Sequence, residues 1–93
     1  MTYSQDTLNE IEEMATNLTK ISDIAIMLDI DENDLRRDIA DPKSDASRAY
    51  RKGKAKCLYE IRRNEIEQAE AGSHESAASV IRYTKQMEDD EQL

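Results

Sequence analysis

Apolar residues recur three and four positions apart along most of the chain, and this is the spacing of one face of an α-helix. In residues 5–18 the apolar stripe includes Leu8, Ile11 and Met14. Comparable stripes predict further helices over residues 20–28, 32–40, 45–71 and 74–88. We therefore predict an all-α fold with five helices and no strand.

Polar and turn-forming residues mark the ends of the predicted helices. Thr19 and Asp31 stand where a side-chain oxygen can accept a hydrogen bond from the first-turn amides of the second and third helices. Pro42 ends the third helix, because proline disfavours helical geometry in the residue before it. The fourth helix then begins at Asp41 or Ser44.

Residues 21–40 have the apolar spacing of two short helices that cross at a tight turn. Ile24 and Leu28 lie four apart and share one helical face, and Ala25 is small enough for a second helix to approach closely. Leu35 and Ile39, again four apart, supply the buried face of the following helix. This spacing is that of a helix-turn-helix.

The exposed face of residues 32–40 is a candidate DNA-reading surface. It would carry Asn33, Arg36 and Arg37, which suit contacts with base edges in a major groove. Acidic residues in the first turn would instead approach phosphates, so the alternative is a three-helix packing unit without DNA contact. Asp29 stands where many such motifs carry glycine, and aspartate tolerates the left-handed backbone that this turn needs.

The formal net charge of −8 gives the chain a field that repels phosphate. Positive charge is concentrated in residues 42–56, which hold six cations and one acid. Lys43 opens this block, and the predicted DNA contacts in it are Arg48, Arg51, Lys52, Lys54 and Lys56. On one helix they can follow the phosphate backbone, and Gly53 would let another backbone come close. The alternative is that these cations neutralise acids on neighbouring helices or on an adjacent subunit.

The last two helices are predicted to form an antiparallel hairpin. Gly72 and Ser73 are typical of a helix end followed by an N-cap, so residues 45–71 and 74–88 can fold back on one another. The longer helix is apolar on two nearly opposite sides, so it has room for two partners. The predicted oligomer interface comprises Tyr59, Ile66, Val80 and Tyr83. The alternative is that Tyr59 and Ile66, on the second side of the longer helix, are two singly exposed apolar residues.

Composition excludes several classes of protein. Only 38% of the 93 residues are apolar and Phe and Trp are absent, which predicts a thin core. The longest apolar run, residues 24–28, is far too short to span a bilayer, so we expect a cytoplasmic protein with no membrane partner. Cys57 is expected to be a small buried hydrophobe. His74 lies in a turn without metal-ligand spacing, so we predict no catalytic residue, metal or cofactor, and no enzymatic activity.

The chain resembles the small terminase subunits of tailed bacteriophages over about residues 20–87. The resemblance follows from the order of motifs and rests on Tyr-Arg-Lys-Gly-Lys at residues 50–54 and Ala-Glu-Ala-Gly-Ser at residues 69–73. It implies a ring of subunits built by the helical hairpin, and a C-terminal segment that meets the large ATPase-nuclease subunit. It also implies that Asn33, Arg36 and Arg37 read viral double-stranded DNA and that Arg51, Lys52 and Lys54 hold its backbone.

We therefore expect a DNA-binding recognition subunit of a phage genome-packaging complex, assembled as a ring or a dimer. Residues 1–42 would form the N-terminal helix and helix-turn-helix, residues 43–87 the hairpin that is basic at its start, and residues 88–93 a disordered acidic tail. Two alternatives remain open. One is a dimeric helix-turn-helix transcription regulator, and the other is a helical adaptor or virion structural protein that does not bind DNA.

Overall fold

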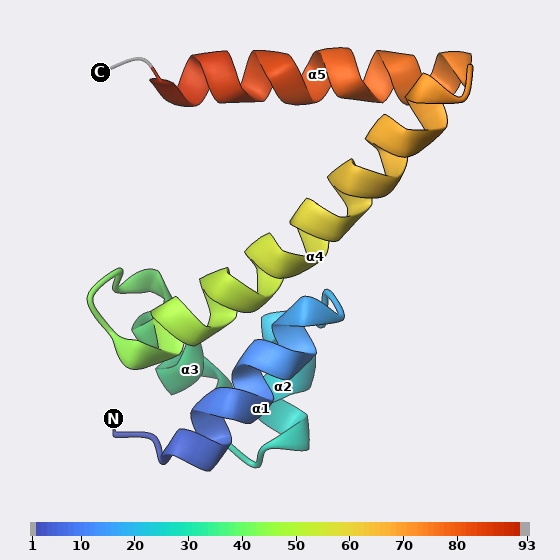
Figure 1. Ribbon diagram of the computed structural model, residues 1–93. Helices are drawn as coiled ribbons and strands as arrows, with labels where there is room; N and C mark the ends of the chain where they lie inside the picture. The colour runs from blue at the N-terminus through green and yellow to red at the C-terminus, as the bar shows by residue number, and fades with distance from the viewer. Residues whose placement is uncertain (1, 92–93) are drawn as a thin grey trace. The chain divides into compact units, whose positions relative to one another are not determined.

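The computed structural model describes residues 2–91, and all regular structure in this range is α-helical, which confirms the all-α class. The helices, drawn in Figure 1, are α1 (Gln5–Thr16), α2 (Ile21–Met27), α3 (Glu32–Ala40), α4 (Asp45–Glu70) and α5 (His74–Glu91). The chain forms two compact units, Met1–Cys57 and Leu58–Leu93, so the division falls inside α4. None of the described helices is long and apolar enough to cross a membrane.

Side-chain caps fix most of the helix starts. Oxygens of Asp31, Ser44 and Ser73 each accept a hydrogen bond from the amide three residues further on, at 2.9, 3.0 and 3.2 Å. Of the two residues considered for the start of α4, the serine therefore caps the helix. The prediction of Thr19 as a cap was wrong. The N-cap of α2 is Lys20, whose side chain makes no capping bond.

The first two helices end in left-handed residues. Leu18 has φ 57° and Asp29 has φ 55°, and each is followed by an amide that bonds back to a carbonyl five residues earlier, at 3.0 and 2.9 Å. This is the Schellman motif, which usually takes glycine at the left-handed position. At the end of α1 the returning amide belongs to Thr19, so this residue closes α1 instead of opening α2. The helix accordingly ends at Thr16, two residues earlier than predicted.

The core of the N-terminal unit is small and draws on four helices. Its buried apolar residues are Ile11, Ala15, Ile24, Ala25, Leu35, Ala46 and Ala49. Leu28, Ile30 and Ile39 are half-buried and pack around this centre. The residues that the sequence placed inside the α2–α3 pair therefore do lie against one another, with Leu35 at the middle of the contact.

Gly53 allows α4 to pack directly on the backbone of α1. A Cβ atom at this position would lie 2.2 Å from the carbonyl oxygen of Glu12 and 2.9 Å from the Cβ of Ala15. Both distances are below van der Waals contact, so no other residue fits without moving a helix. The backbone that approaches Gly53 closely is thus the backbone of α1.

The C-terminal unit joins the end of α4 to α5 through a turn at Gly72, which has φ 103°. Near the turn the helices meet through small polar residues, because Ser76 and Ser79 are buried and the Ser76 hydroxyl donates to Gln68 Oε1 at 3.0 Å. From the turn, α5 and the part of α4 that belongs to this unit, residues 58–70, diverge (Figure 1). The predicted disordered tail differs from the structure, because α5 continues through residues 88–91; residues 92–93 lie outside the described range.

We expect Gly53→Ala to destabilise the protein. The methyl group would gain about 1 kcal/mol of helix propensity, but overpacking costs about 1–3 kcal/mol or more, and a clash with a backbone oxygen cannot be relieved by rotating a side chain. Urea unfolding should show a net loss of stability. The matched control is Ala55→Gly on an exposed part of the same helix, which should lose only about 1 kcal/mol of propensity. Wild-type stability in Gly53→Ala would contradict the close packing of α1 on α4.

Candidate nucleic-acid interface

The α3 helix presents the three predicted DNA-reading residues to solvent. Leu35 is fully buried, and this fixes which face of the helix is inside; Asn33, Arg36 and Arg37 are all exposed. Both guanidinium groups are held by acids of their own helix. Arg36 Nε lies 3.0 Å from an oxygen of Glu32, and an Arg37 nitrogen lies 2.6 Å from Asp34.

These two ion pairs are weak restraints. Pairs of this spacing on an exposed helix contribute about 0.3–0.5 kcal/mol each, so a phosphate or a base edge can replace the acid at small cost. The acids have a local role as well, because Asp31, Glu32 and Asp34 occupy the N-terminal end of α3, where negative charge interacts favourably with the helix dipole. The acidic first turn therefore stabilises α3.

Tyr3 ties the N-terminus to α3. Its hydroxyl donates a 2.6 Å hydrogen bond to Asp38 Oδ2, and its ring packs against the core. Burial raises the pKa of the Tyr3 phenol well above its usual value, and the hydrogen bond and negative charge of Asp38 raise it further. Sequence analysis missed this contact, because the two residues are 35 positions apart and Tyr3 precedes the first amphipathic stripe.

The basic block of α4 is divided by an acid from α1. Lys56 Nζ lies 2.7 Å from one carboxylate oxygen of Glu12, and Lys52 Nζ lies 4.0 Å from the other. The hydrogen bond from Lys56 lowers the pKa of the Glu12 carboxyl below its usual value. These two lysines thus attach α1 to α4. This agrees with the alternative interpretation of the basic block, in which its cations neutralise acids on neighbouring helices, but only for Lys52 and Lys56.

The other cations of the block face solvent. Arg48, Arg51 and Lys54 follow one another at intervals of three residues, so they run along one side of α4, and all are exposed. We call these three residues the basic row. Within residues 2–91 neither they nor the Lys43 ammonium form an ion pair.

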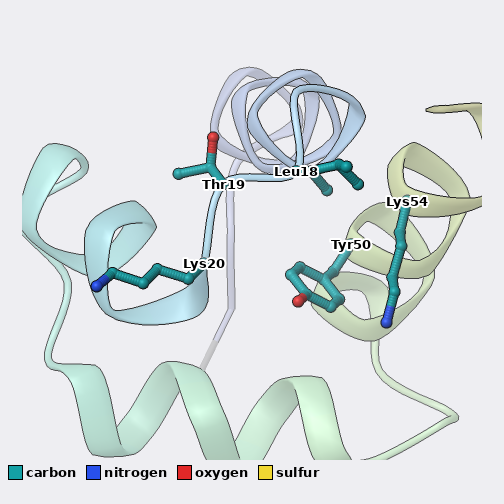
Figure 2. Close-up of a pocket in the computed structure, with 6 residues that line it drawn as sticks. Leu18, Thr19, Lys20, Tyr50 and Lys54 are labelled. Atoms are coloured by element: carbon teal, nitrogen blue, oxygen red, sulfur yellow. The ribbon is translucent and has the colours of Figure 1, made fainter.

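Beside the basic row, α1 and α4 enclose an open cleft of about 250 Å³. Figure 2 shows Tyr50 and Lys54 on α4, facing the connection between α1 and α2, where Leu18, Thr19 and Lys20 lie. Ala15 completes the lining. The Tyr50 ring stands between this connection and the Lys54 side chain, whereas the Lys20 ammonium points away from the ring (Figure 2).

The C-terminal unit carries a larger groove of about 660 Å³ between its two helices. All four residues predicted for an oligomer interface line it: Tyr59, Ile66, Val80 and Tyr83. The Arg62 guanidinium lies 5.3 Å from the centre of the Tyr83 ring, a cation–π contact across the groove. We call this surface the C-terminal groove.

The remaining candidate residues bring no further chemistry together. His74 is exposed at the start of α5, and Cys57 is half-buried, less than the full burial expected for it. In residues 2–91 no group of three or more His, Cys, Asp or Glu side chains could hold a metal ion. No protein-family model matches the chain, and comparisons with curated proteins and with solved structures found no match either.

We expect Tyr3→Phe to weaken the fold by about 1–2 kcal/mol at neutral pH, because it removes a hydrogen bond to a charged partner. The folded pKa of Tyr3 is raised, so the protonated phenol contributes its full stability below pH about 10 and loses it as the pH rises further. The difference between variant and wild type should therefore shrink in urea unfolding above that pH.

Tyr59→Phe is the matched control, since the Tyr59 hydroxyl makes no hydrogen bond to residues 2–91 and the side chain is exposed. It should match wild type in stability at both pH values. A Tyr3→Phe variant as stable as wild type at neutral pH would remove the proposed anchoring of α3.

Proposed function

We propose that this protein is the non-enzymatic DNA-recognition subunit of a phage genome-packaging complex and acts as a homo-oligomer. The observation that carries the proposal is the basic row, because Arg48, Arg51 and Lys54 are exposed and have no acidic partner in the described chain. Three cations at regular spacing on a rigid helix can follow a phosphate backbone. The resemblance to small terminase subunits supports the same assignment.

In this proposal α2 and α3 act as the helix-turn-helix. Asn33, Arg36 and Arg37 read base edges, while the basic row holds the phosphates. Lys52 and Lys56 are assigned a packing role, because they share a carboxylate of another helix, Glu12, whose side chain is 27% exposed. The acids that pair with the α3 arginines lie on α3 itself and are 37% and 46% exposed. The arginines of α3 exchange their intrahelical acids for DNA when they bind, at the small cost expected for exposed pairs.

Assembly explains how a protein of net charge −8 can hold DNA. One basic row acts against the repulsion of the whole subunit, but several rows in one oligomer raise the effective concentration of each contact. The C-terminal groove supports this assembly, because its apolar residues Tyr59, Ile66 and Met87 are 60%, 43% and 64% exposed. A ring would bring the rows together, and the large ATPase-nuclease subunit of the packaging complex would be its partner in the host cytoplasm.

The second candidate function is a helical adaptor or virion structural protein. The observation that favours it is the α3 surface, where both arginines are paired and the first turn is acidic. Such a surface suits a basic protein partner better than a phosphate backbone. A dimeric transcription regulator would use the same α3 residues as the packaging subunit, and it differs in the number of subunits.

The first test removes two cations, either from the basic row or from the pair that contacts Glu12. DNA binding is then measured by fluorescence anisotropy across a salt series. Arg51→Ala/Lys54→Ala should reduce the slope of log K against log salt by about 0.9 per lost contact. Lys52→Ala/Lys56→Ala changes the net charge equally but removes Glu12 contacts, so its slope should stay near that of wild type. Equal losses of slope in the two double variants would show that the net charge of the protein, and not the basic row, governs binding. If wild type does not bind DNA even at low salt, the adaptor becomes the proposed function.

The second test concerns assembly. Ile66→Glu places a charge in the C-terminal groove, and light scattering should then give a mass close to one subunit where wild type forms an oligomer. Ile81→Glu is the matched control, because Ile81 is 71% exposed and does not line the groove. A wild-type protein that is monomeric at micromolar concentration would rule out the ring.

A further inference from the structure

The cleft beside the basic row combines an aromatic ring, an apolar surface and a positive charge. Tyr50 and Leu18 supply the apolar lining, and Lys54 belongs both to this lining and to the basic row. Tyr50 is half-buried, so it packs against the core while it lines the cleft. Arg51, the next residue along α4, is exposed and adds a second cation beside the lining residues.

Leu18 occupies this cleft in a backbone conformation that leucine disfavours. Its φ of 57° lies in the left-handed region, where glycine or asparagine normally ends a helix. Leu18 is 52% exposed, so burial offsets only part of the strain. A strained, half-exposed apolar residue that lines a cleft is a candidate for a role in binding.

The chemistry of the cleft fits an unpaired nucleotide. A base is flat and apolar on its faces, and it stacks on aromatic side chains regardless of its identity, while cations beside the ring hold the adjoining phosphates. Bases inside a duplex are already stacked on their neighbours and present only their edges. A nucleotide in a single-stranded overhang presents its faces freely.

We propose that the cleft holds an unpaired base at a DNA end, stacked against Tyr50 and Leu18, with the adjoining phosphates on Lys54 and Arg51. This inference rests on the proposed DNA-binding function and deepens it. The same row of cations then binds duplex phosphates along α4 and single-strand phosphates at the cleft. The protein therefore distinguishes a DNA end with an overhang from the interior of a duplex.

Leu18→Gly separates this role from folding. Glycine relieves the left-handed backbone and loses only the contacts of a half-exposed side chain, so the variant should melt close to wild type. Asp29→Gly is the matched control, since it makes the same backbone change at the end of α2 and lies outside the cleft. The control also removes one negative charge, and this should raise the affinity for every DNA alike.

The experiment compares three fluorescent DNAs that share one duplex: a blunt duplex, the same duplex with a short thymidine overhang, and one whose overhang is abasic. We expect wild type to bind the thymidine overhang about tenfold more tightly than the blunt end, from the free energy of stacking one base on an aromatic side chain. The abasic overhang carries the same phosphates and should lose this preference. Leu18→Gly should lose it too, whereas Asp29→Gly should keep it.

Each outcome bears on a different claim. Equal binding to blunt and thymidine-overhang DNA would overturn the nucleotide site and leave the proposed duplex binding intact. A preference that survives in the abasic overhang would show phosphate binding alone and would also overturn the site. Failure to bind any of the three DNAs would remove the proposed function together with this inference.

Discussion

The packing of α4 on the backbone of α1 at Gly53 sets the charge that the protein offers to a ligand. Because no side chain separates the two helices there, Glu12 is brought within reach of Lys52 and Lys56. The single negative charge of Glu12 offsets one of these two positive charges, whereas Arg48, Arg51 and Lys54 are exposed and form no ion pair in residues 2–91. A steric constraint at one residue thus brings Lys52 and Lys56 within reach of an acid on α1.

The α3 helix combines two requirements that oppose each other. Acidic residues at its start interact favourably with the helix dipole, and Asp31 caps it, so they help a short helix to form. The same acids bind the arginines that would read DNA. The helix and its cap carry four acids, Asp31, Glu32, Asp34 and Asp38, against two arginines, so this surface is net acidic. Its charge therefore gives no general attraction for DNA, and any selectivity of α3 for DNA would have to come from the geometry of its contacts.

Local patterns were enough to predict the all-α class, the positions of the five helices and several caps, because periodicity and capping depend on residues close in sequence. The predicted N-cap of α2 was wrong because the backbone amide of Thr19 belongs to the Schellman motif that ends α1. The sequence alone does not reveal whether Thr19 closes α1 or begins α2. The sequence also could not show which cations of the basic block form ion pairs, because the acid that pairs with Lys56 lies 44 residues away. The tie between Tyr3 and Asp38 is hidden for the same reason.

The scarcity of buried apolar side chains in the C-terminal unit has a consequence for how the protein responds to dilution. In residues 58–91 the buried residues are the serines Ser76 and Ser79, whereas the N-terminal unit buries an apolar core of its own. With the C-terminal groove filled by a second copy, as proposed, the order of α5 is linked by mass action to subunit concentration. The N-terminal unit needs no such partner, so dilution would loosen one half of the chain and leave the other folded.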